Sequence, residues 1–224
     1  IRPKSFYSSE RDDWSAMEIK VHDIVRFQTS EHLVHFTEIP DWIAQAKSAQ
    51  NYAVVRRMPI TEKVPIGLRG NNRKERHACF INREAIMEVI RPTDLVGKIN
   101  SGRAEHYMST LNDVKRIIAE HRLLWGPTGS IGFELATGIK VTTPYSDYDI
   151  AIYIEEIDTA VLEKLFISLN SLETKLDVQI ELKNVGSFIL LDFIKNYSSG
   201  FLIRTIHGPQ LCKVQNQTIS FVSS

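Results

Sequence analysis

The sequence has few cysteines, no long apolar segment and no net charge, and each absence excludes a class of protein. Among its 224 residues only Cys79 and Cys212 are cysteines, and neither has a C-x-x-C or Cys/His spacing typical of zinc sites. We expect two unpaired, buried thiols in a reducing compartment. No apolar run approaches the roughly 18 residues of a spanning helix, and Ile1 to Lys4 lead into polar residues rather than a secretory signal. We expect a soluble cytoplasmic protein with no membrane partner.

The charges balance overall but are unevenly distributed. With 27 Lys and Arg against 27 Asp and Glu, the net charge is 0, which argues against a nucleic-acid partner. Between Asn51 and His77 there are seven Lys and Arg against two Glu, whereas between Asp147 and Glu181 there are nine Asp and Glu against two Lys. A basic and an acidic segment in one chain can hold a polyphosphate and its metal ions, or can form two solvated faces.

Hydrophobic periodicity divides the chain into three parts. Residues 1–16 are polar without a clear period, and we interpret them as a flexible or expression-derived extension. Residues 17–95 form a smaller, β-rich N-terminal domain for substrate or partner binding, with a short helix starting at Pro40 and a strand within 51–57. Residues 96–224 form a domain with helices packed on a mixed sheet, so the fold class is α+β.

The C-terminal part has the clearer pattern. Apolar residues at helical spacing predict a helix over 104–120, and Asp158 is placed to cap a second helix. Residues 146–155 and 175–181 alternate between polar and apolar, which predicts two strands. We also expect Ser187 to cap a helix that continues through Asn196, and 201–206 to return as a strand.

Two carboxylates lie two residues apart in the first of these strands. Asp147 and Asp149 would project from one face, with Ile150 and Ile152 on the other. Like charges so close repel, and a divalent cation such as Mg²⁺ can supply the missing positive charge. The alternative is an exposed edge strand with solvated Asp residues. Asp177 lies on the next strand along the chain, and adjacent strands would add it to the same surface, where three acids can hold two metal ions. For Gln179 and Glu181, which share the face of Asp177, a plain polar surface remains possible.

A glycine-rich turn precedes the carboxylates. The run Gly126-Pro127-Thr128-Gly129-Ser130 lies between an apolar segment and a predicted helix. Backbone amides at the start of a helix point toward an anion, and the Ser130 hydroxyl can donate as well. A Gly-Ser dipeptide alone indicates only a turn. Its position before the D-x-D strand favours its being part of the same site.

This order resembles the polymerase β-like nucleotidyltransferase superfamily, whose pattern is Gly-Ser, D-x-D and a third carboxylate on a later strand. The longer runs 125–138 and 146–149, with 22–25, 54–57 and 65–70, resemble a narrower family, the malonate decarboxylase holo-acyl-carrier-protein synthases, also called phosphoribosyl-dephospho-CoA transferases. The likeness covers most of the chain from Met17. Tyr148 replaces the more usual leucine, and we expect its side chain to point away from the carboxylates.

The resemblance implies a function. Such an enzyme transfers a prosthetic group from triphosphoribosyl-dephospho-CoA to a serine of the acyl-carrier protein subunit of malonate decarboxylase, and pyrophosphate leaves. Asp147, Asp149 and Asp177 would be catalytic and would bind two Mg²⁺ ions, or Mn²⁺. The substrate would be bound by Gly129 and Ser130, with Arg69, Arg73 and Arg76 on the phosphates or on the carrier. Arg204 and Lys213 are further candidates of that kind.

Three alternatives remain open at this point. The enzyme could be the citrate lyase counterpart, or it could adenylylate a substrate from ATP. It could also be a non-catalytic carrier-binding module, although all four of Ser130, Asp147, Asp149 and Asp177 are present.

Overall fold

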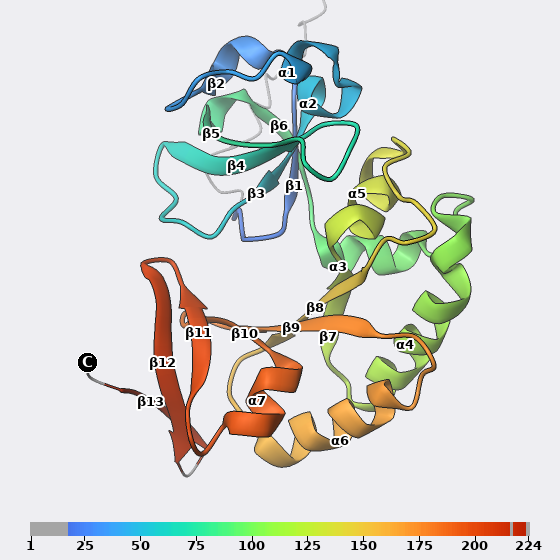
Figure 1. Cartoon of the computed structure of the whole chain (residues 1–224), viewed down its shortest axis with the longest axis vertical. Coiled ribbons are helices and arrows are strands. Elements are labelled where there is room, and N and C mark those ends of the chain that lie inside the picture. Colours follow the sequence, from blue (N-terminus) through green and yellow to red (C-terminus); the bar gives the residue numbers. More distant parts are fainter. Residues whose placement is uncertain (1–17, 216, 223–224) are drawn as a thin grey trace, which may run out of the picture.

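The computed structural model describes residues 18–215 and 217–222, so the extension expected over residues 1–16 lies outside the described residues. Two parts follow each other along the chain, each built on its own sheet (Figure 1). Helices and strands contribute comparably, and one sheet is antiparallel while the other is mixed, which confirms the α+β class.

The N-terminal part is built on an antiparallel sheet. Within the described range its six strands have the order β2-β5-β4-β3-β1-β6. Short helices α1 (Trp42–Gln45) and α2 (Lys47–Asn51) pack with the sheet around a separate apolar core. The expected helix after Pro40 and the strand within 51–57 are confirmed. The strands are β1 (Ile24–Phe27), β2 (Leu33–Val34), β3 (Tyr52–Val55), β4 (Lys63–Arg69), β5 (Arg76–Asn82) and β6 (Ile86–Ile90).

The C-terminal part is built on a mixed sheet. The described residues form seven strands in the order β13-β12-β11-β10-β9-β8-β7, in which β8 and β9 are parallel. Figure 1 shows α6 and α7 on the side of the sheet away from the N-terminal part, and α5 on the side that faces it. The strands are β7 (Leu124–Pro127), β8 (Tyr148–Ile154), β9 (Leu176–Leu182), β10 (Gly186–Ile189), β11 (Phe201–Thr205), β12 (Gly208–Gln215) and β13 (Thr218–Phe221). The helices are α3 (Pro92–Leu95), α4 (Met108–Glu120), α5 (Gly129–Thr137), α6 (Thr159–Asn170) and α7 (Leu190–Asn196).

Most expected elements of this part are present, with shifted ends. The helix expected from residue 104 begins as a 3-10 turn and becomes α4 only at Met108, because Ala104 has a left-handed backbone (φ 50°). The Asp158 carboxylate accepts a hydrogen bond from the Val161 amide and caps α6, as predicted. The expectation for Ser187 is wrong. Ser187 lies inside β10, paired with Glu181 and Arg204, and α7 begins three residues later without a side-chain cap.

A buried carboxylate joins the two parts. Glu181 Oε1 lies 2.9 Å from His22 Nε2 and 2.5 Å from Arg57 Nη2 of the N-terminal part, and 2.5 Å from Gln179 Nε2. The Glu181 side chain is only 12% exposed. Burial alone would raise the pKa of this carboxyl, but the hydrogen bonds and charges of His22 and Arg57 outweigh it and lower the pKa. The plain polar surface considered for Gln179 and Glu181 is therefore wrong, since both take part in the junction.

Cys79 and Cys212 are both free and buried, as predicted. Within the part of the chain that the structure describes, no helix is long and apolar enough to cross a membrane.

We expect Glu181→Gln to lower the free energy of unfolding at pH 7 by about 1.5–3 kcal/mol, since hydrogen bonds to a charged group are lost. Because the folded state lowers the pKa of Glu181, this stabilisation is present above its usual value of 4.5 and is lost as the pH falls through the lowered pKa. Urea unfolding at pH 7 and at the lowest pH that retains the fold measures both effects. Glu155→Gln, at an exposed ion pair with Lys183, is the control and should change little. An equal effect of the two substitutions at pH 7 would contradict the prediction.

Candidate active site

Asp149 and Asp177 lie side by side on parallel strands. They are register partners in the β8–β9 pair, so their side chains project from the same face of the sheet, about 5 Å apart at the backbone. The opposite face of β8 is anchored by the buried Ile150 and Ile152, as expected. The convergence expected for these two carboxylates is therefore present.

Asp147 is placed differently from the expectation. It precedes β8, which begins at Tyr148, so it belongs to the incoming loop rather than to the strand. Its Oδ2 accepts a hydrogen bond from Arg73 Nη2 at 3.1 Å. Tyr148 packs against Tyr107 on the apolar core, with ring centroids 5.0 Å apart, and so points away from the carboxylates as predicted.

Gly129 lies directly against Asp149. A Cβ atom at position 129 would be 1.9 Å from Asp149 Oδ2, and the backbone φ of +59° also favours glycine. The Thr128 amide donates to the Asp149 carbonyl at 2.8 Å, which fastens this turn to β8. Gly129 and Ser130 then begin α5, and both remain accessible to solvent. Gly126 and Pro127, expected in the turn, belong to β7 instead.

Burial and like charges act on Asp149 together. Burial, followed by the charges of Asp177 and Asp147, raises its pKa to about 6, while Arg73 and His22 oppose the shift. A carboxyl group with such neighbours favours a cation or a proton at this point.

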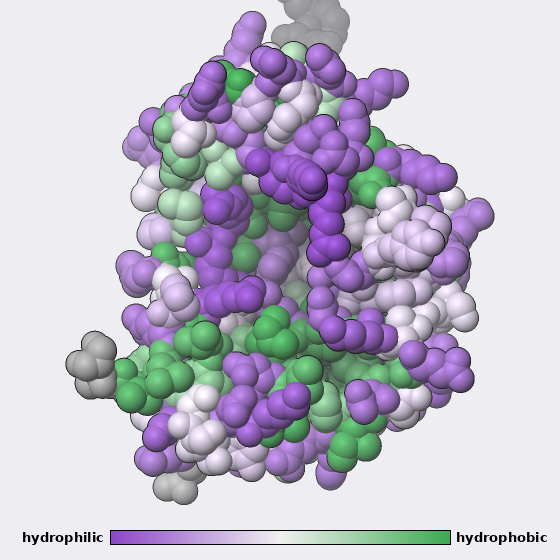
Figure 2. All heavy atoms as spheres, in the orientation of Figure 1, coloured by the Kyte–Doolittle hydropathy of each residue, from purple (hydrophilic) through white to green (hydrophobic). Residues whose placement is uncertain are grey.

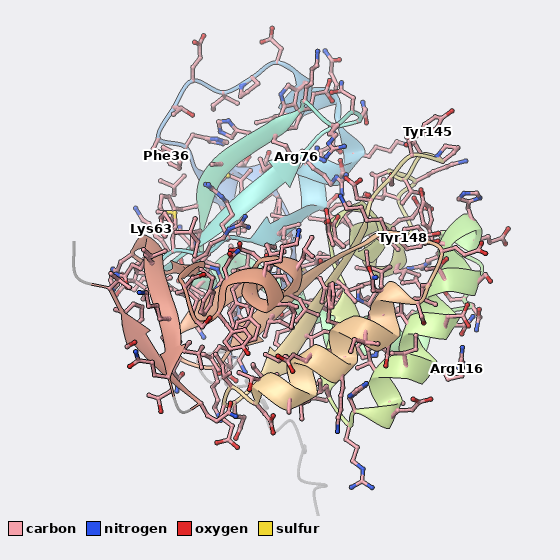
Figure 3. The ribbon with its side chains drawn as sticks, turned by 60° about the horizontal axis from the view of Figure 1, so that its bottom comes forward. Phe36, Lys63, Arg76, Arg116, Tyr145 and Tyr148 are labelled. Atoms are coloured by element: carbon pink, nitrogen blue, oxygen red, sulfur yellow. The ribbon has the colours of Figure 1, made fainter. Side chains whose placement is uncertain are left out.

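The end of the β4–β5 hairpin brings three arginines to this site. Arg69 and Arg76 are register partners at the end of the hairpin, and Arg73 lies in the turn between them. Figure 3 shows Arg76 at the end nearer to Tyr148 and Lys63 at the opposite end. The basic segment of the sequence therefore faces its acidic segment, and the two are not separate solvated surfaces.

Arg69 is the buried member of this set. Its Nη1 donates to the Gly129 carbonyl at 3.4 Å, and its guanidinium lies 5.1 Å from the centroid of the Phe133 ring. Burial and the charge of Arg76 lower its pKa to about 10, and Asp149 and Glu134 act in the other direction. Its buried Nε has no hydrogen-bond partner among the described residues. An anion at the start of α5 would supply an acceptor for such a donor.

Arg73 and Arg76 have different surroundings. Arg73 is 86% exposed and pairs with Asp147. Arg76 Nη1 donates to the carbonyls of Asn72 and Glu75, which holds the shape of the turn. Burial and the charge of Arg73 lower the pKa of Arg76.

Glu134 positions the loop that carries Asp147, a role that sequence reasoning missed. This buried residue of α5 accepts hydrogen bonds from the amides of Ala104, Val141 and Thr142 and from the Thr142 hydroxyl. Burial raises the pKa of its carboxyl, but the hydrogen bonds of Thr142 and Val141 outweigh burial and lower it. The only available signal was an acidic residue between apolar neighbours in a predicted helix.

The three aspartates do not form a closed set of ligands in this conformation. Across residues 18–215 and 217–222, no group of three or more His, Cys, Asp and Glu is gathered closely enough to hold a metal ion. Asp149 and Asp177 converge, while Asp147 is turned to Arg73. The donor chemistry nevertheless fits a hard divalent cation, since carboxylate oxygens are ligands that Mg²⁺ prefers.

Comparisons with known proteins cover both parts of the chain. The family model of the phosphoribosyl-dephospho-CoA transferase MdcG C-terminal domain matches residues 94–215, and that of the N-terminal domain matches residues 20–92. These limits agree with a division between the two parts near residue 93. No solved structure was found to match the chain.

Curated relatives carry the same description. A phosphoribosyl-dephospho-CoA transferase of Pseudomonas putida (strain W619) is 31% identical over 71% of this chain and 78% of its own length. That of Klebsiella pneumoniae (strain 342) is 28% identical over 85% of this chain and 92% of its own length. That of Azotobacter vinelandii is also 28% identical, over 71% of this chain and 77% of its own length.

We expect Gly129→Ala to lower the free energy of unfolding by about 1–3 kcal/mol, because the new methyl group meets the Asp149 carboxylate in a left-handed backbone conformation. Thermal unfolding followed by circular dichroism measures the change. Gly97→Ala is the matched control, since no atom lies within 4 Å of its added Cβ. Equal melting temperatures for the two variants would refute the close contact.

Asp149→Asn should stabilise the metal-free protein. The raised pKa means that the folded state disfavours the ionised carboxyl, so its destabilising effect grows as the pH rises from 3.8 through about 6. We expect a gain of roughly 1–2 kcal/mol at pH 8, discounted because the carboxyl is partly solvated. The gain should vanish below pH 3.8. Urea unfolding in EDTA at both pH values tests this, and a less stable variant at pH 8 would contradict it.

Proposed function

The chain belongs to the phosphoribosyl-dephospho-CoA transferase family and is a transferase of that kind, and from this premise we propose its substrates and chemistry. It transfers the 2′-(5″-phosphoribosyl)-3′-dephospho-CoA group from the triphosphate precursor to a serine of the malonate decarboxylase acyl-carrier subunit. The observation that carries the proposal is the pairing of Asp149 with Asp177 directly beneath Gly129.

The three aspartates are the proposed metal ligands. Asp149 and Asp177, joined by Asp147 after its release from Arg73, would hold two Mg²⁺ or Mn²⁺ ions, which would lower the pKa of the acceptor hydroxyl and offset phosphate charge. The support is the raised pKa of Asp149, whose neighbouring carboxylates Asp177 and Asp147 act on it as like charges. This is the chemistry of polymerase β-like nucleotidyltransferases, the superfamily to which we assign the C-terminal part.

The start of α5 binds the leaving group. The amides and hydroxyl of Gly129 and Ser130 hold the β and γ phosphates, where the helix N-terminus favours negative charge. Arg69, buried beside the Gly129 carbonyl, offers its unsatisfied Nε, and Arg73 and Arg76 add positive charge from the hairpin end.

The reaction is a displacement at the α phosphorus. The carrier serine oxygen forms the new P–O bond, the bond to the β phosphate breaks, and pyrophosphate leaves. The proton of the serine passes to Asp177, which is the more exposed member of the paired carboxylates. Ser130 binds phosphate and does not act as a nucleophile.

Transfer can be tested by mass spectrometry of the carrier subunit after incubation with Mg²⁺ and the donor. Asp149→Asn and Asp177→Asn should each reduce the rate by at least about 100-fold, because each removes a ligand of the reacting centre. Asp113→Asn, at a surface pair on α4, is the matched control and should retain full activity.

The alternatives give different results in this assay. Modification of the citrate lyase carrier instead of the malonate decarboxylase carrier would change the assigned partner only. An AMP adduct formed from ATP, with none from triphosphoribosyl-dephospho-CoA, would overturn the proposed donor. Full turnover by the Asp149→Asn, Asp177→Asn double variant would overturn the metal assignment.

A further inference from the structure

Two adjoining cavities extend from the active-site face of the sheet. One, of 430 Å³, lies between the N-terminal part and the sheet and is lined by His22, Arg56 and Arg57 among others. The other, of 340 Å³, lies beside β10, α7 and β11. Gln179, Arg204 and Pro209 line both, so the cavities form one groove. Figure 2 shows the molecule hollowed between its two parts, with hydrophilic side chains along the upper side and hydrophobic ones below.

The second cavity results from the sheet topology. In the described residues β10 and β11 pair only at Ser187 and Arg204, because the chain leaves β10 to form α7. The two strands therefore separate beyond this pair. Apolar side chains of Ile189, Leu191 and Leu202 line the opening, and Leu191 and Leu202 are 41% and 53% exposed.

An unsatisfied hydroxyl group lines this opening. Ser187 is 0% exposed, and its Oγ has no hydrogen-bond partner within the described chain. A buried polar group left without a partner is destabilising, and a ligand atom at this point would offset that cost. The position of Ser187 on the wall of a cavity makes a ligand the natural partner.

Positive charge in the groove has no acidic partner among the described residues. Arg56, Lys195 and Arg204 line it, and none of them forms an ion pair with another described residue. The acidic residue on the wall, Asp192, already accepts hydrogen bonds from Asn196 and from the Leu202 amide. The groove thus combines free cations with an apolar opening, which suits a ligand with phosphates at one end and a mostly apolar arm at the other.

The groove begins next to the reacting centre. Gln179 follows Asp177 by two residues on β9 and projects from the same face, at a distance of roughly 7 Å along the strand. A donor with its triphosphate at Gly129 can therefore continue along β9 into the groove.

We propose that this groove binds the dephospho-CoA portion of the donor. Arg204, assisted by Lys195 and Arg56, holds its diphosphate, Ser187 donates a hydrogen bond to it, and the pantetheine arm lies in the apolar opening between β10 and β11. The assignment rests on the proposed function for the identity of the donor.

The test is calorimetric binding of dephospho-CoA and, separately, of inorganic triphosphate to the full chain. Arg204→Ala should weaken dephospho-CoA binding by at least about 10-fold and leave triphosphate binding unchanged. Arg116→Ala, at an exposed pair on α4, is the matched control and should bind both probes as the parent does. Unchanged dephospho-CoA affinity in Arg204→Ala, or an equal loss for both probes, would overturn the proposal.

Ser187→Ala separates a ligand-binding role from a structural one. Because the hydroxyl has no partner in the described protein, its removal should leave the melting temperature of the ligand-free chain unchanged or raise it, while dephospho-CoA affinity falls several-fold. A lower melting temperature with unchanged affinity would assign Ser187 to the fold and refute its contact with the ligand.

Transfer kinetics distinguish failure of the groove from failure of the proposed function. In Arg204→Ala the KM for the donor should rise while kcat stays within about twofold, since Arg204 lies on β11, two strands from Asp177 on β9. An unchanged KM in an active enzyme would overturn the groove alone. If dephospho-CoA binding depends on Arg204 but the protein shows no transfer, the groove proposal stands and the proposed reaction is overturned.

Discussion

Where β8 passes beneath the start of α5, Gly129 and the Asp149 carboxylate are in contact, and no side chain fits between them. The other features of the site depend on this close contact between Gly129 and Asp149. The contact limits the access of water to Asp149, Asp177 lies beside it in register, and together these raise its pKa to about 6. The same contact places the N-terminus of α5, where backbone amides favour an anion, beside the carboxylates of Asp149 and Asp177. A helix N-terminus and two carboxylates therefore meet at one turn, and the proposed binding of phosphate and metal ions rests on this arrangement.

The N-terminal part completes this arrangement. The end of its β4–β5 hairpin supplies the arginines, and Arg69 reaches the Gly129 carbonyl from a buried position. Carboxylates on the C-terminal sheet thus face cations from the other part of the chain, which explains why a chain of zero net charge has such separate basic and acidic segments. Neither part alone holds the whole set of charges.

Local patterns in the sequence predicted the order of strand, Gly-Ser turn, helix and D-x-D strand, because these depend on neighbours along the chain. They also predicted that Asp177 joins Asp149, since one helix between two strands is typical of a parallel crossover. They failed where a residue's role depends on distant partners. The sequence favours a helix cap at Ser187, because its strand is only four residues long and α7 follows it directly. For Glu181 the alternation of the strand still allows a polar surface, because His22 and Arg57 come from the other part of the chain. The assignment of metal ligands and substrate contacts stays a prediction.

A single oxygen of Glu181 serves donors from both parts of the molecule. If the parts swung apart as rigid bodies, this carboxylate would lose His22 and Arg57 and keep Gln179, and a half-buried charge without its cationic partner is energetically unfavourable. Wide hinge opening is therefore disfavoured in this enzyme. Access to Asp149 and Asp177 then depends on the turn at Arg73 and on the loop that carries Asp147, which are joined by an exposed ion pair.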